Sequence, residues 1–312
     1  DTQPGIQPIA DREKINRTNK FKIYLHARGR LGNHMFQAAA AIGMSVWTKR
    51  EIVFHPNTFS YIRKGFKFDL QNNSHSIGTM EHSKIKQVYE INAFAFEPEK
   101  YSHFPPGDVE ICCALQTWKY FAHISDMVRR LYSFHDDVEK EANNYVKSVR
   151  SASRKDLLVG VHIRRTDIIT IDYAVKQLGV NICPVDYMIK AMDHYRSKYR
   201  SVHFIVCSDD IEWSIDQLKN FTDISFSSGH KPKEDLAILS KCNHSVLTHG
   251  TFGWWGAWLA GGDVVYYDDN FINKRKLEFE LKHYFLPDWI GRRSRNGNQC
   301  DRHGRRICHS GG

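Results

Sequence analysis

Two adjacent arginines, Arg164 and Arg165, lie in the segment VHIRRTD at residues 161–167, directly after the apolar run LLVG at residues 157–160. The run has the composition of a buried strand, and ligands of open α/β sheets bind beyond the carboxyl ends of the strands. An arginine can hold two phosphate oxygens at once through its planar fork, which lysine cannot reproduce. The segment therefore predicts an anion site that could hold a diphosphate.

Three further segments have polar side chains where predicted strands end or predicted helices begin. The segment SDD at residues 208–210 follows a predicted strand, and Asp235 lies in the first turn of a predicted helix. In the segment HGTFGWW at residues 249–255, Thr251 opens a helix, and a helix N-terminus favours a phosphate. Helix capping is the alternative role for the acidic residues, and core packing is the alternative for the tryptophans.

Apolar strands alternate with helices through the second half of the chain. Strands that are joined by single helices form a parallel, doubly wound sheet. The strands are predicted at 157–163, 202–207, 224–226, 245–248 and 264–267, and the helices at 184–199, 211–221, 233–241 and 251–260.

The first half of the chain begins with a strand, a glycine-containing turn and a helix. The turn is RGRLGN at residues 28–33. The later elements have no predicted topology. Strands are predicted at 21–25, 52–54 and 94–96, and helices at 34–47 and 123–131.

The chain length of 312 residues favours two domains. A small polar joint at residues 151–155 marks the predicted boundary. We expect a stem or linker over 1–19, an N-terminal α/β domain over 20–150, a C-terminal α/β domain over 151–285 and a basic tail over 286–312.

A net charge of +9 would suit nucleic acid, an anionic membrane or a phosphorylated substrate. No nucleic-acid-binding motif accompanies the charge, so nucleic acid is not a predicted partner. The seven cysteines include no Cys-x-x-Cys pair, which disfavours a zinc site. Cys300 and Cys308 could form a disulfide in an oxidising compartment.

No run of eighteen apolar residues is present, so no membrane span is predicted. The chain begins with Asp1 rather than methionine, which suggests that a leader or anchor preceded it. Acceptor triplets for N-glycosylation permit a secretory location. The triplets begin at Asn16, Asn72, Asn220 and Asn243.

Four segments, in their order along the chain, resemble those of the α-1,2-fucosyltransferase family, which belongs to a wider group with α-1,6- and protein O-fucosyltransferases. The resemblance covers residues 21 to about 270. The segments are GRLGN at 29–33, HIRRTD at 162–167, SDDIEW at 208–213, and the stretch 235–259 that contains TFGWW.

The resemblance implies a GT-B fold of two facing Rossmann-like domains, with GDP-fucose held mainly by the C-terminal domain and the acceptor glycan by the N-terminal one. Asp235 matches a position that holds the guanine in related enzymes. Arg30 and Asn33 match a motif that reaches across the cleft. The implied catalytic residues are Arg164, Asn33 and Asp167, and the implied donor-binding residues are Arg30, His162, Arg165, Ser208, Asp209, Asp235, Thr251 and Phe252.

The implied reaction is an inverting transfer of fucose from GDP-β-L-fucose to the 2-hydroxyl of a terminal β-galactose. The leaving diphosphate needs positive charge, which Arg164 could supply. No two aspartates stand two residues apart as in an Asp-x-Asp metal site, so we expect no metal and no other cofactor. The general base stays open among Asp167, His26, His34 and carboxylates of the N-terminal domain.

Two places in the chain depart from the pattern that is usual in the α-1,2 family. The chain has TDI at residues 166–168 where glycine, aspartate and tyrosine are usual, and His34 where glutamine is common. The family also implies a type II membrane protein, with a signal anchor, in the Golgi lumen.

Three alternatives compete with this hypothesis. A protein O-fucosyltransferase would share the arginines, and an inactive carbohydrate-binding relative would share the cleft. A nicotinamide dehydrogenase is disfavoured, because the turn at residues 29–32 lacks the Gly-x-Gly-x-x-Gly spacing.

Overall fold

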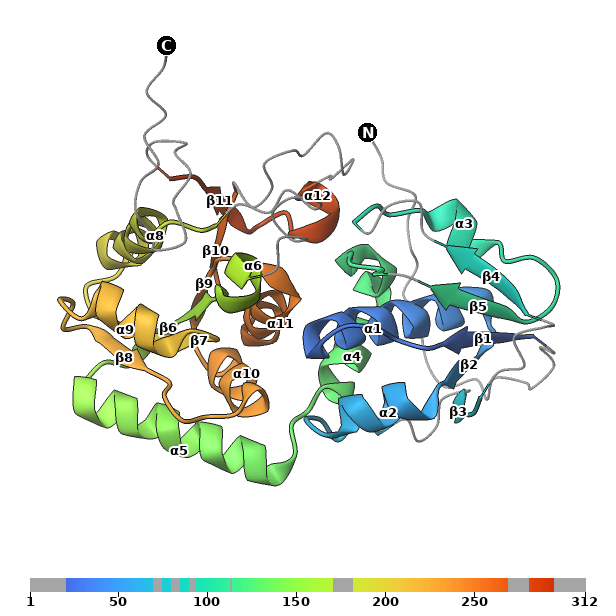
Figure 1. Ribbon diagram of the computed structural model, residues 1–312, viewed down its shortest axis with the longest axis horizontal. Coiled ribbons are helices and arrows are strands. Elements are labelled where there is room, and N and C mark those ends of the chain that lie inside the picture. The colour runs from blue at the N-terminus through green and yellow to red at the C-terminus, as the bar shows by residue number, and fades with distance from the viewer. Residues whose placement is uncertain are drawn as a thin grey trace, which may run out of the picture.

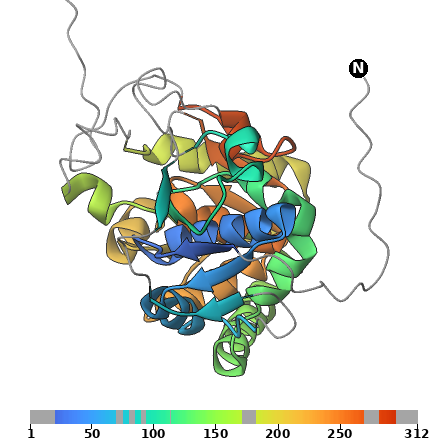
Figure 2. The ribbon, with the colours of Figure 1, turned by 90° about the vertical axis from the view of Figure 1, so that its right-hand side faces the viewer.

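The computed structural model of the protein describes residues 21–69, 75–79, 85–89, 94–112, 114–170, 182–268 and 281–294. Over these residues the chain forms two α/β units, each with one sheet whose strand pairs are all parallel. The units lie side by side in Figure 1, and Figure 2 shows the first unit in front of the second. The predicted stem, Cys300 and Cys308 lie outside the described residues. Within the described ranges, no helix combines the length and apolar character needed to cross a membrane.

The first unit has a five-stranded sheet in the order β3-β2-β1-β5-β4. The chain extends the sheet from β1 in one direction and then returns to the other side of β1. The topological switch point therefore lies between β1 and β5. The strands are β1 (Lys22–Leu25), β2 (Glu51–Phe54), β3 (His75–Ile77), β4 (Lys86–Tyr89) and β5 (Val109–Cys112), and the helices are α1 (Leu31–Thr48), α2 (Pro56–Arg63), α3 (Pro98–Ser102), η2 (Trp118–Tyr120), η3 (Ala122–Ile124) and α4 (Ser125–Leu131).

The second unit has a six-stranded sheet in the order β11-β10-β9-β6-β7-β8, with its switch point between β6 and β9. The predicted alternation of strands and helices is confirmed here. The strands are β6 (Leu157–Ile163), β7 (Val202–Ser208), β8 (Ile224–Phe226), β9 (His244–Leu247), β10 (Val264–Tyr267) and β11 (Ile290–Arg292), and the helices are α5 (Asp136–Ser153), α6 (Thr166–Thr170), α8 (Val185–Lys198), α9 (Ile211–Leu218), α10 (Pro232–Ser240), α11 (Gly250–Ala260) and α12 (Leu281–Tyr284).

The predicted strand at 94–96 is wrong, because these residues form no strand. The backbone N–H of Phe96 donates to Nδ1 of His283 at 3.1 Å instead of to a neighbouring strand. The aromatic side chains that suggested a strand pack against other rings: Phe94 lies 5.4 Å from Tyr284 and Phe96 lies 5.2 Å from Tyr120. Aromatic content alone therefore misled the prediction.

Helix α5, which the sequence did not predict, begins before the predicted boundary at residues 151–155, runs into it, and packs against α10 of the second unit (Figure 1). The side chains of Val138, Ala142, Val146 and Val149 on α5 are buried. Acidic side chains of α5 form ion pairs with lysines of α10 and its C-terminal cap. Lys233 lies 3.6 Å from Asp137, and Lys241 also pairs with Glu139. The helix therefore belongs with the second sheet by its contacts.

The two units share one continuous aromatic core where α1 meets α11 (Figure 1). The ring of Phe36 on α1 lies 4.5 Å from that of Trp254 and 5.0 Å from that of Trp255, both on α11. The indole N–H of Trp255 donates to the Gly32 carbonyl at 3.1 Å. Both tryptophans are fully buried, which confirms their predicted packing role.

Gly32 permits the close approach of α1 and α11, since a Cβ on it would lie 2.6 Å from Thr251 Oγ1 and 2.7 Å from the Phe252 nitrogen. We expect Gly32→Ala to lower the free energy of unfolding by about 1–3 kcal/mol, because the backbone at Thr251 and Phe252 cannot move away from the new methyl group as a flexible side chain could. This cost should exceed the gain from the higher helix propensity of alanine. Urea unfolding would measure this. Gly65→Ala is the control, since its nearest new contact would be Lys233 Cβ at 3.7 Å. Equal stability of the two variants would contradict the prediction.

Candidate active site

The two switch points face each other where the first turns of α1 and α11 meet. The hydroxyl of Thr251 donates to Oδ1 of Asn33 at 2.8 Å, and Nε2 of Gln116 donates to the same oxygen at 3.3 Å. Gln116 follows β5, so the three side chains join both units. Gly29, at φ +94°, leaves the room that Asn33 needs, because a Cβ there would lie 2.4 Å from Asn33 Nδ2.

Asp167 lies between two arginines from different units. Arg164 donates to it in a bidentate pair, from Nε to Oδ1 at 2.9 Å and from Nη2 to Oδ2 at 2.6 Å. Arg30, from the first unit, has Nη1 3.4 Å from Oδ2. Burial raises the pKa of Asp167, but the hydrogen bonds and charge of Arg164, with the charge of Arg30, hold that pKa below its ordinary value. The carboxylate is thus ionised at neutral pH.

The guanidinium of Arg164 lies against the start of α11. The backbone N–H of Arg164 donates to Thr248 Oγ1 at 2.9 Å. A Cβ on Gly250 would lie only 2.3 Å from Nη1 of Arg164. Gly250 also has φ +82°, which favours glycine. Arg164 and the helix N-terminus both present positive charge here, and an anion would be stabilised by both. The predicted anion site is thus supported by the geometry of the second switch point.

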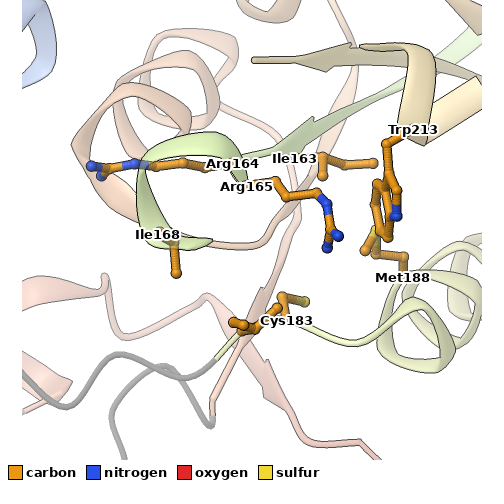
Figure 3. Close-up of a pocket in the computed structure, with 8 residues that line it drawn as sticks. Ile163, Arg164, Arg165, Ile168, Cys183, Met188 and Trp213 are labelled. Atoms are coloured by element: carbon orange, nitrogen blue, oxygen red, sulfur yellow. The ribbon is translucent and has the colours of Figure 1, made fainter. Parts of the chain in front are cut away.

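Arg165 points away from Arg164 (Figure 3). Its guanidinium carbon lies 3.9 Å from the centre of the Trp213 ring, its Nε lies 3.3 Å from Asp210, and its side chain is 7% exposed. A buried guanidinium that is stacked on an indole and paired with a carboxylate stabilises the fold. Of the two neighbouring arginines, the structure brings only Arg164 to Asp167 and Arg30.

Asp209 holds the turn that carries these arginines, whereas Ser208 bonds within its own turn. Asp209 accepts hydrogen bonds from the backbone N–H groups of Arg165 at 2.7 Å and Thr166 at 3.2 Å. Ser208 accepts one from the backbone of Asp210 at 3.0 Å. The predicted helix cap is Asp210, whose carboxylate accepts from the backbone N–H of Trp213 in the first turn of α9 at 3.4 Å.

His162 lies buried beneath the first turn of α11. Its ring centre is 5.2 Å from that of Phe252, and a Cβ on Gly253 would lie 2.4 Å from its Nδ1. Burial lowers the pKa of His162 to about 4, which leaves the ring neutral at physiological pH. Its Nδ1 has no hydrogen-bond partner among the described residues.

Asp235 lies in the first turn of α10 and accepts a hydrogen bond from the Ser227 hydroxyl at 2.5 Å. Burial raises the pKa of this carboxyl to about 6. In the described part of the chain its side chain makes no hydrogen bond or ion pair with Arg164 or Arg30. Asp235 therefore forms a second polar position, separate from the arginine network.

Gln116 and Thr248 are site residues that the sequence did not reveal. Thr248 follows β9 beside the predicted segment at 249–255, so its position at a strand end was a usable signal. Gln116 lies in a stretch with no motif and reaches Asn33 only through the fold. Among the described residues, no three His, Cys, Asp or Glu side chains group so as to hold a metal ion.

Comparison with known proteins agrees with this geometry. The chain is 30% identical over 274 residues to the galactoside 2-alpha-L-fucosyltransferase SEC1 of Bos taurus, covering 86% of this chain and 73% of that protein. It is also 30% identical over 282 residues to the galactoside alpha-(1,2)-fucosyltransferase 2 of Sus scrofa, covering 86% and 78%. The fucosyltransferase NodZ from Bradyrhizobium shares the fold, with a TM-score of 0.50, 14% identity, and coverage of 77% of this chain and 91% of that one.

This agreement confirms the predicted fold class of two facing Rossmann-like units. It also confirms the resemblance on which the family prediction depended. Residues 3–293 match the family model of glycosyl transferase family 11, and the chain belongs to that family.

Proposed function

We propose that the protein transfers L-fucose from GDP-β-L-fucose to the 2-hydroxyl of a terminal β-galactose, with inversion at the sugar carbon. The names of its relatives, galactoside 2-fucosyltransferases, support this substrate pair. The observation that carries the proposal is the position of Arg164, which lies at the second switch point, against the start of α11 and beside Arg30 of the other unit. These positive groups are what a diphosphate requires of its binding site.

The arginines stabilise the departing GDP. As the bond between fucose and phosphate breaks, the sugar becomes cationic and the diphosphate gains negative charge. Arg164 meets that charge with its planar fork, and Asp167 is the positioning residue that fixes the plane of the fork through two hydrogen bonds. Arg30, with a side chain that is 73% exposed, adds a charge from the acceptor side.

Most of the remaining contacts with GDP-fucose are made by residues of the second unit. Asp235 accepts hydrogen bonds from the guanine ring, and the neutral His162 lies beside Phe252 near the phosphates. Thr251 and Asn33, which are bonded to each other, connect the donor to the N-terminal unit. Arg165 and Asp209 act indirectly, by holding the turn in which Arg164 lies, and Ser208 supports the neighbouring turn through its bond with the backbone N–H of Asp210.

The cellular setting forms part of the same proposal. The full-length protein is a type II membrane protein of the Golgi lumen, in which residues 1–19 are a stem. The predicted basic tail over 286–312 is wrong at its start, because residues 290–292 form β11 of the second sheet. The N-terminal unit holds a galactose-terminated glycan, nucleic acid is no partner, and catalysis needs no metal because Arg164 and Arg30 supply the positive charge.

The test of this function is transfer from GDP-fucose to N-acetyllactosamine in the presence of EDTA. We expect a trisaccharide with an α-linked fucose on the galactose 2-hydroxyl, which NMR linkage analysis identifies. Loss of turnover in EDTA that manganese restores would contradict the metal-independent mechanism. Transfer to a folded cysteine-rich domain but to no galactoside would instead favour a protein O-fucosyltransferase.

We expect Arg164→Lys to lower kcat by the equivalent of about 2–4 kcal/mol, because lysine keeps the charge but loses the planar fork. Steady-state kinetics with saturating GDP-fucose measures the change. Arg196→Lys is the matched control, since Arg196 makes the same bidentate pair with Asp223, at 2.7 and 2.8 Å, at the amino end of β8. Near wild-type turnover of Arg164→Lys would show that its role is wrongly assigned.

Asp235 predicts a pH dependence of donor binding. Its pKa is raised by burial from 3.8 to about 6, and only the ionised carboxylate accepts both guanine donors. The affinity for GDP-fucose should therefore fall about tenfold for each pH unit below 6. Calorimetry can measure this with GDP-fucose, whose esterified diphosphate does not titrate in this range. In Asp235→Asn the dependence should disappear, and an unchanged slope would exclude Asp235 as its source.

A further inference from the structure

Four rings gather at the carboxyl edge of the first sheet, beyond the arginine network, and we call them the imidazole cluster: His26, His34, His55 and Tyr61. His26 follows β1 and His55 follows β2, which are neighbouring strands. Their rings stack with centres 3.9 Å apart and planes 19° apart. The ring of His34 lies 4.5 Å from that of Tyr61.

The imidazole cluster adjoins the site in which the donor is proposed to bind. His26 opens the loop that ends at Arg30, the residue 3.4 Å from Asp167 of the second unit. His34 follows Asn33, which bonds Thr251 of the second unit. β1 borders the switch point of the first sheet, where open α/β sheets bind their ligands.

The loop that carries His26 is held firmly in place. The backbone N–H of Ala27 donates to the Thr58 hydroxyl at 2.9 Å. The side-chain amide of Gln37 accepts a hydrogen bond from the backbone N–H of Arg28 at 3.0 Å and donates one to the Arg28 carbonyl at 2.8 Å. The cluster is therefore preorganised, which lowers the entropic cost of binding a ligand.

The surroundings of two rings in the cluster define how their nitrogen atoms form hydrogen bonds. Nδ1 of His55 accepts from the backbone N–H of Asn57 at 3.2 Å, so the ring proton is on Nε2, which is a donor. His34 is 8% exposed, and its Nδ1 has no partner among the described residues. Burial lowers the pKa of His34, which keeps that ring neutral.

These properties suit a neutral sugar rather than an anion. The faces of aromatic rings pack on the C–H groups of a pyranose, and ring nitrogens bond its hydroxyls. The arginines beside the cluster suit the charged donor instead. We infer that the imidazole cluster binds the terminal galactose of the acceptor, which rests on the proposed function.

Two variants test the inference without removing the local structure. His55→Asn keeps an acceptor for the N–H of Asn57, since asparagine caps helices well, but removes the ring. His26→Phe keeps a ring against His55 but removes its nitrogens. The measurements are the Kd of N-acetyllactosamine with saturating GDP, the Kd of GDP alone and the thermal unfolding midpoint, for both variants and for the wild type.

We expect the Kd of N-acetyllactosamine to rise about tenfold or more in at least one variant, while the Kd of GDP stays within about twofold. His75→Asn is the matched control, because His75 begins β3 and so lies at the amino end of the strands, away from the carboxyl ends that carry the cluster. This variant should change neither Kd. An unchanged galactoside Kd in both folded variants, or no galactoside binding by the wild type, would overturn the inference. Failure of the proposed function is a separate result: the wild type would transfer no fucose.

Discussion

The contact between the first turns of α1 and α11 is the constraint on which the site depends. Each helix follows a strand at the switch point of its own sheet, so their meeting brings the two ligand-binding edges together. Gly32 leaves no room for a side chain at this contact, and the buried rings of Phe36, Trp254 and Trp255 hold the helices in place. The separation of the two sheets is thus set by packing, which is stiff because protein interiors are close-packed.

A single carboxylate organises the charge that lies across this contact. Asp167 bonds Arg164 of its own unit and lies near Arg30 of the other. One negative charge between two arginines leaves a net positive charge, to which the start of α11 adds. The proposed donor, a diphosphate, would therefore meet positive groups from both units, whereas the imidazole cluster beside them offers aromatic rings and a buried His34 whose pKa is lowered. The arginine side of the site thus matches the charged donor, and the imidazole cluster matches the uncharged galactose of the acceptor.

The sequence determined the second unit well, because its signals are local. Apolar runs, capping residues and glycines give the period of each element, and the alternation of strands with helices implies a parallel sheet. The position of Arg164 at a strand end also followed from its neighbours along the chain. The first unit was less predictable: the aromatic residues at 94–96 form tertiary ring contacts, and α5 carries a helical spacing of buried residues that a mostly polar composition obscured.

Only the tertiary structure decided which of the predicted residues come together. Arg164 and Arg165 are adjacent and chemically identical, yet Arg164 bonds Asp167, which Arg30 also approaches, while Arg165 packs on Trp213. The pairs Asn33 with Thr251 and Gln116 with Asn33 join residues far apart in the chain. The physical reason is that residue types and spacing specify local conformation and chemical capacity, whereas partners across a domain contact depend on how close two helices can pack. In this protein that distance depends on the absence of a side chain at Gly32.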